Sequence, residues 1–432
     1  MRRMHLLAYL KTGPTANHLG AWRHPQSSIH DIFSPDRYEH IARVLEDACF
    51  DGCFFADLLA LPDFYRGGFD TYLRRGGQIS FLDPMTVLPL MARVTKHLGL
   101  GATLSTTFFP AYHLARMLGS LDKLSGGRAA WNIVTSATDT EAKNFGDEKI
   151  PPREERYDRA DEVLEACCAL WNCWEPDAFV LDKEAGVFAD PSKVRHADYQ
   201  GRYVSTRGPL SIPPSPQGRP VLMQAGASDR GREFAARWAE MVFCTPLAVT
   251  DAIALSTDIR NRMARYGRAP EECAILPSIT VVVGETDSIA REKAALIDSL
   301  ADPELALAYN SSLLAVDLST HATEADVAKA QQNQGIEGSA DRIRQVMKAE
   351  GVDFAKAAAR PRQAIVGTAK GIADELEAWF RSGACDGFVL WPTVFPAMFE
   401  EFCRGVVPEL QRRGLFRTEY AGTTLRENLR QA

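Results

Sequence analysis

GGRAAWNIVTSATDTEAKNFGDEKIPPREERY, residues 126–157, is the stretch that decides the fold. After two glycines, the apolar run 129–131 predicts a buried strand, and Asn132 and Ser136 come where that strand meets a loop. A parallel barrel holds a polar ligand at its strand ends, and small hydroxyl and amide groups in this place suit such a barrel. Residues 153–174 repeat apolar side chains at three- and four-residue steps, which predicts a helix directly after the loop.

The order of strand and then helix repeats along the rest of the chain. Besides the strand that begins at residue 129, apolar strands are predicted at 4–10, 52–57, 98–107, 220–226, 241–246, 274–284 and 387–392. Amphipathic helices or long insertions separate successive strands, as in parallel sheets with right-handed crossovers. The pattern therefore predicts an α/β fold, a (β/α)8 barrel of the TIM type.

Two long segments interrupt this alternation, so we expect one barrel domain over residues 1–432 with insertions at about 137–219 and 302–362. Within the first insertion, apolar residues at 179–181 and 203–205 predict the two strands of a β-hairpin. The second insertion is alanine-rich and too long for a bare connection. We interpret it as a lid over the site or as a contact between subunits.

The composition excludes several classes of partner. The 432 residues are 46% hydrophobic and 24% charged, which is enough apolar material for a large core. The net charge is -7 and the basic residues are scattered, whereas nucleic-acid binding needs a concentrated basic face. The nine cysteines are irregularly spaced, which indicates reduced core thiols and not a disulfide framework. The first apolar run is too short for a signal peptide or a spanning helix, so we expect a cytoplasmic protein with a small-molecule ligand.

Two strand ends carry candidate ligand-binding residues. Asp57 ends an apolar strand, and a carboxylate there must either bond to backbone amides or face a ligand cleft. Residues 224–231 lead from a strand into a helix, whose free N–H groups and positive dipole end suit a phosphate. Ser228 is either a plain N-cap there or a phosphate contact, and Arg230 and Arg232 favour the anion.

Further candidates lie at a helix start and in loops. Tyr157 and Arg153 stand where a hydroxyl and a cation can reach the same phosphate; otherwise Tyr157 is a core residue and Arg153 a solvated charge. His18, Trp22 and Gln78 are loop residues and candidates for substrate contact at the barrel mouth. The sequence has no paired histidines and no CxxC, GxSxG or phosphate-loop motif, so we expect no metal and a bound organic cofactor.

Several motifs resemble those of one enzyme family over nearly the whole chain. They are WRHP (22–25), HLGLGATLSTT (97–107), LDKLSGGRAAWNIVTS (121–136), NFG (144–146), ERYDRADE (155–162), SPQGRPVLMQAGASDRGREFAA (215–236) and VVPELQRRGLFRTEY (406–420). Together with the strand that ends at Asp57, they resemble the bacterial luciferase-like flavin monooxygenases. The similar branch contains the nitrilotriacetate, dibenzothiophene-sulfone and long-chain alkane monooxygenases, and GRxxWNxVTS combined with RYDxADE is the specific part.

The resemblance implies a two-component oxygenase. Such an enzyme binds reduced FMN supplied by a separate NAD(P)H-dependent flavin reductase and uses O2 to oxidise a small organic substrate. An organosulfur compound or an amine, with cleavage of a C–S or C–N bond, is typical of this branch, and so is a homodimer or homotetramer. The alternatives are a deazaflavin-dependent oxidoreductase, a non-catalytic flavin-binding protein and, ranked last, a phosphate-binding barrel of the aldolase type.

Position by position, the resemblance also assigns residues to the flavin. The matching residues are Asp57, Thr103, Asn132, Ser136, Tyr157 and Ser228, of which the last two lie on the phosphate side. Many relatives carry a histidine four residues before the tyrosine, where this chain has Arg153. A guanidinium matches phosphate geometry, so we expect Arg153 to add a permanent positive charge there. No residue stands out as a catalytic acid or base.

Overall fold

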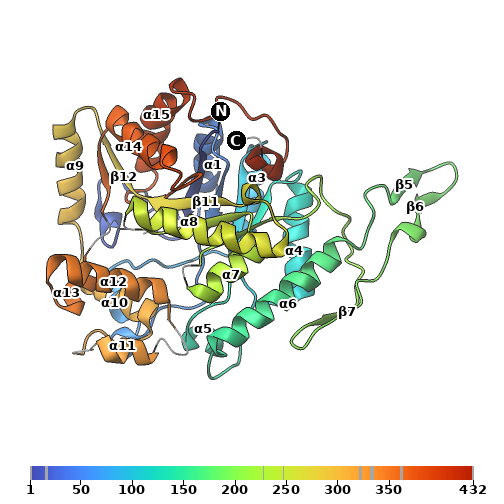
Figure 1. The fold of residues 1–432 in the computed structure, drawn as a ribbon, viewed down its shortest axis with the longest axis horizontal. Coiled ribbons are helices and arrows are strands. Elements are labelled where there is room, and N and C mark those ends of the chain that lie inside the picture. Colours follow the sequence, from blue (N-terminus) through green and yellow to red (C-terminus); the bar gives the residue numbers. More distant parts are fainter. Residues whose placement is uncertain are drawn as a thin grey trace.

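Eight parallel strands close into a barrel in the computed structural model, which describes residues 2–14, 18–226, 228–246, 248–320, 324–330, 335–360 and 363–430 (Figure 1). Around the barrel the strands are β1 (His5–Leu10), β2 (Gly52–Phe55), β3 (Gly99–Ser105), β4 (Ala129–Val134), β9 (Val221–Gln224), β10 (Met241–Cys244), β11 (Ala274–Ile279) and β14 (Gly387–Leu390). β14 pairs with β1 and so closes the ring. The predicted TIM-type barrel and its eight strands are confirmed.

Amphipathic helices cover the outside of this barrel. They are α1 (Pro35–Asp47), α3 (Pro84–Val94), α4 (Ala111–Leu124), α6 (Arg153–Trp171), α7 (Asp229–Trp238), α8 (Val249–Met263), α14 (Ala369–Arg381) and α15 (Ala397–Arg412). At the start of α1, the Ser34 hydroxyl accepts the Asp36 N–H, and Pro35 takes a position where its missing N–H is not needed. Each strand buries one face against helices and one inside the barrel, which is why the strands are continuous apolar runs.

The inside of the barrel is filled with side chains, as is usual for this architecture. Tyr9, Phe54, Met223 and Trp391 are among the residues that pack there. Gly101 faces this cluster, and a Cβ at that position would lie 2.5 Å from the Cβ of Phe54. A residue without a side chain is therefore needed at this point of β3 to let the Phe54 ring cross the barrel.

The second insertion forms a helical unit at the opposite end of the barrel from the two termini (Figure 1). Within the described residues its helices are α10 (Pro303–Leu314), α11 (Glu324–Ala330), α12 (Glu337–Glu350) and α13 (Phe354–Ala358). Leu314, Ile343 and Phe354 belong to a buried core of its own. Arg75, in the loop after β2, bonds to Asp302 at 2.9 Å and ties the unit to the barrel. The unit thus lies over the carboxyl ends of the barrel strands.

The seventh predicted strand, 274–284, is wrong in its length. β11 ends at Ile279, and β12 (Val281–Gly284) leaves the barrel to pair with β13 (Ile365–Thr368) in a separate two-stranded sheet. α9 (Asp287–Ser299) and α15 pack on this small sheet, and most of β12 is buried. Apolar residues therefore continue beyond Thr280 although the strand changes its partner.

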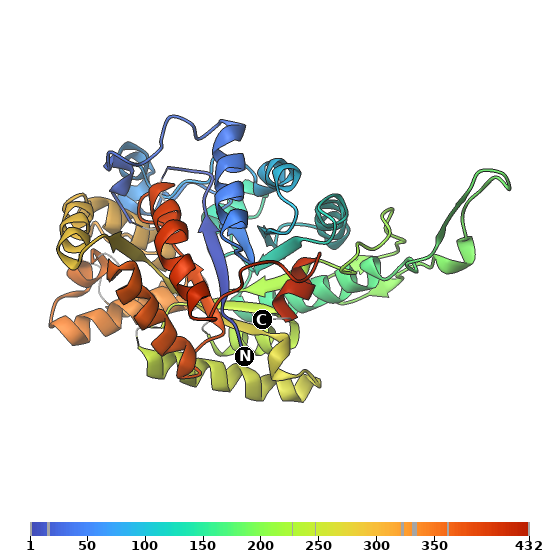
Figure 2. The ribbon, with the colours of Figure 1, turned by 90° about the horizontal axis from the view of Figure 1, so that it is seen from above.

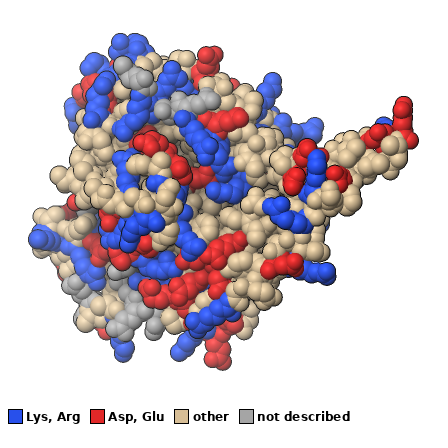
Figure 3. All heavy atoms as spheres, turned by 45° about the vertical axis from the view of Figure 1, so that its right-hand side comes forward, with Lys and Arg blue, Asp and Glu red and all other residues tan. Residues whose placement is uncertain are grey.

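The predicted hairpin between 179–181 and 203–205 is also wrong. β5 (Phe179–Asp182) pairs with β6 (Val187–Ala189), and β7 (Tyr199–Gln200) pairs with β8 (Ser205–Thr206), so there are two local hairpins. The carboxylate of Asp182 accepts two backbone N–H groups of the next residues, which makes the first turn locally. We call β5, β6 and their turn the arm. It projects far from the barrel (Figures 1 and 2), and most of its visible surface is uncharged (Figure 3).

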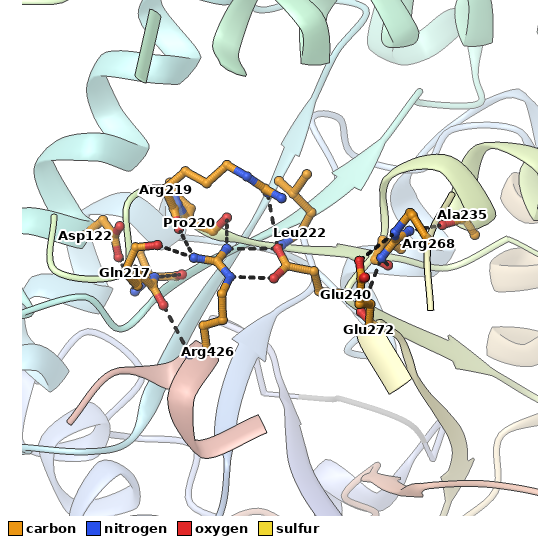
Figure 4. A network of polar contacts seen from close by, with 12 residues as sticks. Asp122, Gln217, Arg219, Pro220, Leu222, Ala235, Glu240, Arg268, Glu272 and Arg426 are labelled. Atoms are coloured by element: carbon orange, nitrogen blue, oxygen red, sulfur yellow. Dashed lines mark hydrogen bonds and ion pairs between the residues drawn. The ribbon is translucent and has the colours of Figure 1, made fainter. Parts of the chain in front are cut away.

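A charged network seals the barrel at the amino ends of its strands (Figure 4). Arg426, in α16 (Leu425–Arg430), donates from Nε to Glu240 at 2.6 Å and from Nη2 to the second oxygen of that carboxylate at 2.9 Å. The same guanidinium donates to the carbonyl oxygens of Gln217 and Arg219, shortly before β9. These bonds fix the last helix to the loop that leads into β9.

The cysteines act as packing residues. All nine are free thiols and seven of them are buried, which confirms the prediction of reduced core thiols. Burial raises the pKa of Cys53 and of Cys244 to about 12, so both thiols stay protonated at neutral pH. No helix among the described residues combines the length and the apolar character that a membrane span requires.

Candidate functional site

Thr103 and Asn132 lie side by side near the carboxyl ends of β3 and β4. The Asn132 amide donates to the Thr103 hydroxyl at 2.8 Å, and that hydroxyl donates to the Phe55 carbonyl at 2.7 Å. The other amide atom, Asn132 Oδ1, is buried and has no hydrogen-bond partner among the described residues. A buried acceptor without a partner costs about 1–3 kcal/mol, so this oxygen is suited to accept from a bound ligand.

Ser136 stands in a strained turn just beyond β4. Its φ is 54°, a left-handed backbone conformation that serine seldom adopts. The Ser136 hydroxyl lies 3.1 Å from a carboxylate oxygen of Glu141 and 3.0 Å from the hydroxyl of Ser105. Glu141 also accepts backbone N–H groups of the turn and caps α5 (Asp139–Asn144). Glu141 is absent from the residues predicted above, although Thr138 and Glu141 show the T-x-x-E pattern of a capping box.

Tyr157 and Ser228 meet at the starts of two helices. Ser228 caps α7 by accepting the Gly231 N–H at 3.1 Å, and the Tyr157 hydroxyl bonds to the Ser228 side chain. A Cβ on Gly231 would lie 3.0 Å from both side-chain oxygens, so the three residues are in contact. Burial raises the pKa of Tyr157 against the opposing effect of Ser228, which leaves the phenol a neutral donor. Two hydroxyls beside the first N–H groups of a helix form a site suited to an anion.

Two arginines stand beside this hydroxyl pair at the start of α6. Arg156 is buried and donates to the Pro151 carbonyl at 2.9 Å. Burial and the positive charge of Arg153 lower the pKa of Arg156 to about 10, while Tyr157 acts to raise it. The Arg156 guanidinium therefore stays charged at neutral pH. Arg156 is missing from the predicted residues because an arginine on a helix is usually solvated until its burial is known.

Arg230 and Arg232 both pair with carboxylates, and the Arg230 guanidinium also lies 5.2 Å from the centre of the Tyr157 ring. Arg230 donates to Asp161 at 2.7 Å and to Asp158 at 3.2 Å, both on α6. Arg232 lies 3.1 Å from the carboxylate of Asp258 on α8. These pairs join neighbouring helices to one another, and the expectation that the two arginines favour an anion stays a prediction.

Asp57 lies at the barrel mouth near a lysine that follows β1. Its Oδ1 accepts the Leu58 N–H at 2.8 Å. Burial raises the pKa of Asp57 against the opposing effects of Ser80 and Lys11. Burial likewise lowers the pKa of Lys11 to about 8, and Asp57 opposes that change. The bond to the Leu58 N–H agrees with the first expectation for Asp57, and its contact with a ligand stays a prediction.

The loop candidates separate into two groups. His18 and Gln78 line a pocket between the barrel mouth and the helical unit, together with Asn310 of α10. Trp22 is not part of that lining: its indole N–H donates to a backbone carbonyl of the loop after β2 at 2.8 Å, and Gly76 packs on its ring. Trp22 therefore supports the loop that carries Gln78.

A cavity of about 560 Å³ lies at the other end of the barrel. Arg426, Glu240 and Asp386 line it near the amino ends of the strands, and their charges are paired: Arg426 with Glu240 at 2.6 Å and Asp386 with Arg260 at 2.8 Å. Barrel enzymes carry their active sites at the carboxyl ends of the strands. We therefore place the candidate site at the mouth under the helical unit. Within the described part of the chain, no three His, Cys, Asp or Glu side chains gather to hold a metal ion.

Comparisons with known proteins find relatives along the whole chain. Residues 14–386 match the family model described as luciferase-like monooxygenase. The chain is 43% identical to dibenzothiophene-sulfone monooxygenase of Rhodococcus erythropolis (strain XP), over 99% of this chain and 96% of that protein. It is 37% identical to nitrilotriacetate monooxygenase component A of Aminobacter aminovorans, over 95% of this chain and 93% of that protein. The crystal structure of riboflavin lyase with modified FMN and substrate riboflavin matches with a TM-score of 0.90 and 30% identity, over 100% of this chain and 96% of that chain.

Proposed function

Because this chain belongs to the luciferase-like monooxygenase family, we propose that it is the oxygenase of a two-component system that uses reduced FMN and O2. A separate NAD(P)H-dependent flavin reductase supplies the reduced flavin. The substrate is a small organosulfur compound or amine, whose oxidation cleaves a C–S or C–N bond. The relatives' names support this choice, since dibenzothiophene sulfone is an organosulfur compound, nitrilotriacetate is an amine, and "component A" denotes part of a larger system.

The observation that carries the proposal is the contact of Tyr157 with Ser228 at the start of α7. Two hydroxyls and helix N–H groups suit the FMN phosphate, and Arg153 and Arg156 add positive charge. The unpaired Asn132 Oδ1 needs an N–H donor, which the flavin ring carries. The residues present therefore fit FMN. When bound, reduced FMN supplies the electrons that activate O2, a chemistry that no side chain here provides.

The chain's own residues bind, orient and shield in this proposal. Tyr157 and Ser228 donate to phosphate oxygens, and Arg153 neutralises the phosphate charge. Thr103 holds the Asn132 amide in one orientation, because the hydroxyl accepts from Nδ2 and leaves Oδ1 free for the ligand. The helical unit covers the mouth and excludes water, which protects reactive species from side reactions.

We also propose that the chain forms a homodimer or homotetramer in which the arm contacts a second copy. Phe188 is 69% exposed and Leu181 is 59% exposed, although both side chains are apolar. A two-stranded ribbon is marginally stable on its own in water, so the arm needs a surface to pack on. A second copy of the chain is always present at the same concentration, which favours it as the partner.

Oxygen consumption with a supplied reductase tests the proposed activity. Purified protein, FMN, NADH and a flavin reductase are combined with sulfones, tertiary amines and alkanes in turn. We expect oxygen uptake coupled to product for at least one class, with one oxygen atom from labelled O2 in the product. Reductase without this protein and this protein without reductase are the controls. Turnover under argon, or with a deazaflavin in place of FMN, would refute the proposal.

A further inference from the structure

The pocket under the helical unit contains polar atoms whose hydrogen bonds are incomplete. It is lined by His18 and Leu19 from the loop after β1, Gln78 from the loop after β2, and Asn310 of α10. Thr393, just past β14, borders it on the barrel side. The free space is about 50 Å³, which holds one functional group of a small molecule and not a whole fused-ring system.

His18 offers this pocket a donor and an acceptor. The residue is 6% exposed, and neither ring nitrogen has a hydrogen-bond partner among the described residues. Burial lowers the pKa of His18 more than the Asp298 carboxylate raises it, so the ring is neutral at pH 7. A neutral imidazole carries one N–H donor and one acceptor in either tautomer.

Asn310 offers the pocket a second acceptor, its amide oxygen. The hydrogen bonds of the amide nitrogen identify which of the two amide atoms is the oxygen. Nδ2 donates to the Ala306 carbonyl at 2.9 Å and to the Ala358 carbonyl at 2.8 Å. Because both partners are acceptors, the nitrogen must occupy this position and the amide cannot be reversed. Oδ1 is left without a partner in the described part of the chain, although the residue is 3% exposed. An N–H or O–H group is needed to satisfy it.

We propose that this pocket selects substrates with an uncharged group that carries both a hydrogen-bond donor and an acceptor, such as an amide, a primary sulfonamide or a hydroxyl group. The donor bonds to Asn310 Oδ1, and the acceptor takes the N–H of His18. Dibenzothiophene sulfone and alkanes have no donor and would leave Asn310 unpaired. The inference rests on the proposed function, because it takes the neighbouring barrel mouth to be the place where the substrate is oxidised.

The charged residues around the pocket do not favour an ionised substrate. Asp302 lines the pocket and pairs with Arg75 at 2.9 Å. Arg360 also lines it and pairs with Glu350 at 2.8 Å, and Arg342 has interactions of its own. A charged group would therefore be buried against a neutral imidazole and an amide oxygen, which do not compensate its lost hydration.

Matched ligand pairs test the inference through binding alone. The members of a pair have similar size and the same acceptor, but one of them has a donor: benzenesulfonamide against methyl phenyl sulfone, and benzamide against acetophenone. Dissociation constants are measured by titration calorimetry on the protein loaded with oxidised FMN. We expect the donor-bearing member of at least one pair to bind about tenfold more tightly. Equal affinity within both pairs, or no binding by any of the four, would overturn the inference.

Two variants test the proposed contacts of Asn310 and His18 separately. Asn310→Ala removes the acceptor, so the two members of a pair should bind equally; a tenfold preference that persists would overturn the inference. His18→Phe removes the shared donor, so both members should weaken while their ratio stays the same. Asn310→Ala also loses the two Nδ2 bonds, and if that variant does not fold, the ratios in the wild type and in His18→Phe decide.

Failure of this inference can be told apart from failure of the proposed function. FMN affinity and reductase-coupled formation of oxygenated product are measured separately from ligand binding. Absence of oxygenated product with intact ligand ratios speaks against the oxygenase proposal alone. Formation of oxygenated product with no preference for a donor speaks against the specificity pocket alone.

Discussion

The two ends of the barrel treat buried polar groups differently. At the amino ends of the strands, Arg128 makes five hydrogen bonds to oxygens of α3 and of the loops beside it. Asp51 is buried there and accepts from Arg417 and from a backbone N–H. At the carboxyl ends, Asn132 and Ser278 each keep a buried oxygen acceptor that has no partner in the described part of the chain, whereas the buried atoms without a partner beside the amino-end network, Arg417 Nη1 and Asn428 Nδ2, are nitrogens.

This difference separates what holds the barrel together from what serves a ligand. Removing one partner of a buried ion pair leaves an uncompensated charge, so such pairs make a structure intolerant of change. An unpaired buried atom costs stability, and a fold retains it where a ligand completes the bond. Substitutions at the amino end should therefore change the free energy of unfolding, and substitutions at the carboxyl end should change ligand affinity.

Arg417→Met should have the largest effect on stability. The Asp51 carboxylate would stay buried without its main cation, which costs about 3–5 kcal/mol of unfolding free energy. Arg412→Met is the control, because the Arg412 side chain is 69% exposed in its pair with Glu409, where solvent screens the attraction, and its loss should leave stability nearly unchanged. Urea unfolding at pH 7 measures both. Similar losses in the two variants would show that the buried pair does not hold the barrel closed.

Tyr157→Phe should weaken FMN binding by about 1.5–3 kcal/mol, because a hydroxyl that donates to a charged phosphate is lost. Ser228→Ala, combined with it, should weaken binding further and also remove the cap of α7. Tyr199→Phe is the control, since the Tyr199 hydroxyl donates to Glu165 at 2.6 Å and has no role in the site. Flavin titration followed by fluorescence gives the affinities. Unchanged binding in Tyr157→Phe would place the phosphate elsewhere.

Asp122→Asn tests the amino end of the barrel through the pH dependence of the unfolding free energy. This carboxyl is buried there without a close cation. Burial raises the pKa of Asp122 to about 6, against the opposing effects of Ser215, the Ala129 N–H and Gln217. The folded state thus binds the proton more tightly than the unfolded chain, whose carboxyl has a pKa of about 3.9. The stability linked to this proton is present below that pKa and is lost as the pH rises through 6.

The asparagine variant should therefore gain about 1–3 kcal/mol relative to the wild type between pH 4 and pH 7. Asparagine keeps an oxygen for the Ala129 N–H and Gln217, and the Ser215 hydroxyl can turn to accept from the new amide. Unfolding free energies of both proteins at pH 4, 5.5 and 7 measure the change. A difference that is constant with pH would contradict the expected titration.

Ser278→Ala should have the smallest effect on stability, within about 0.5 kcal/mol of zero or slightly favourable, because the lost hydroxyl has no partner. The same change at the amino end, Ser125→Ala, should cost about 1 kcal/mol, since Ser125 accepts the Arg128 N–H and donates to the Asp122 carbonyl, both at 3.2 Å. Thermal and urea unfolding compare the two. A larger loss of unfolding free energy in Ser278→Ala than in Ser125→Ala would contradict the assignment of the amino end to stability and the carboxyl end to ligand binding.

The fold could be predicted from sequence because each barrel strand is buried on both faces and each helix start carries local signals. The Ser34–Pro35 start of α1 is one such signal. The two wrong predictions concern segments whose local sequence pattern fits more than one pairing of strands. Residues 274–284 are mostly apolar, and apolar residues follow both Ser278 and Thr280, so the pattern does not mark the change of partner after Ile279. The arm was mispaired because Asp182 makes its turn with a side chain, which periodicity does not detect.

The candidate site was predictable in part. Tyr157 and Ser228 each follow a local pattern at a helix start, and the structure brings them into contact. The sequence could not indicate Arg156 and Lys11 as site residues, because their burial depends on residues distant in the sequence. Asn310 was missed for the same reason: its importance follows from an oxygen left over after two carbonyls have used its nitrogen.

The ring closes between the first and the last of its strands, where His5 lies opposite Gly387. While the ribosome makes the chain, β1 must wait for β14 with one edge uncovered, and such an edge is a template for pairing with other chains. The Arg426 bonds form later still. Slow or interrupted translation should therefore yield aggregates that need chaperones, and not shortened proteins with partial activity.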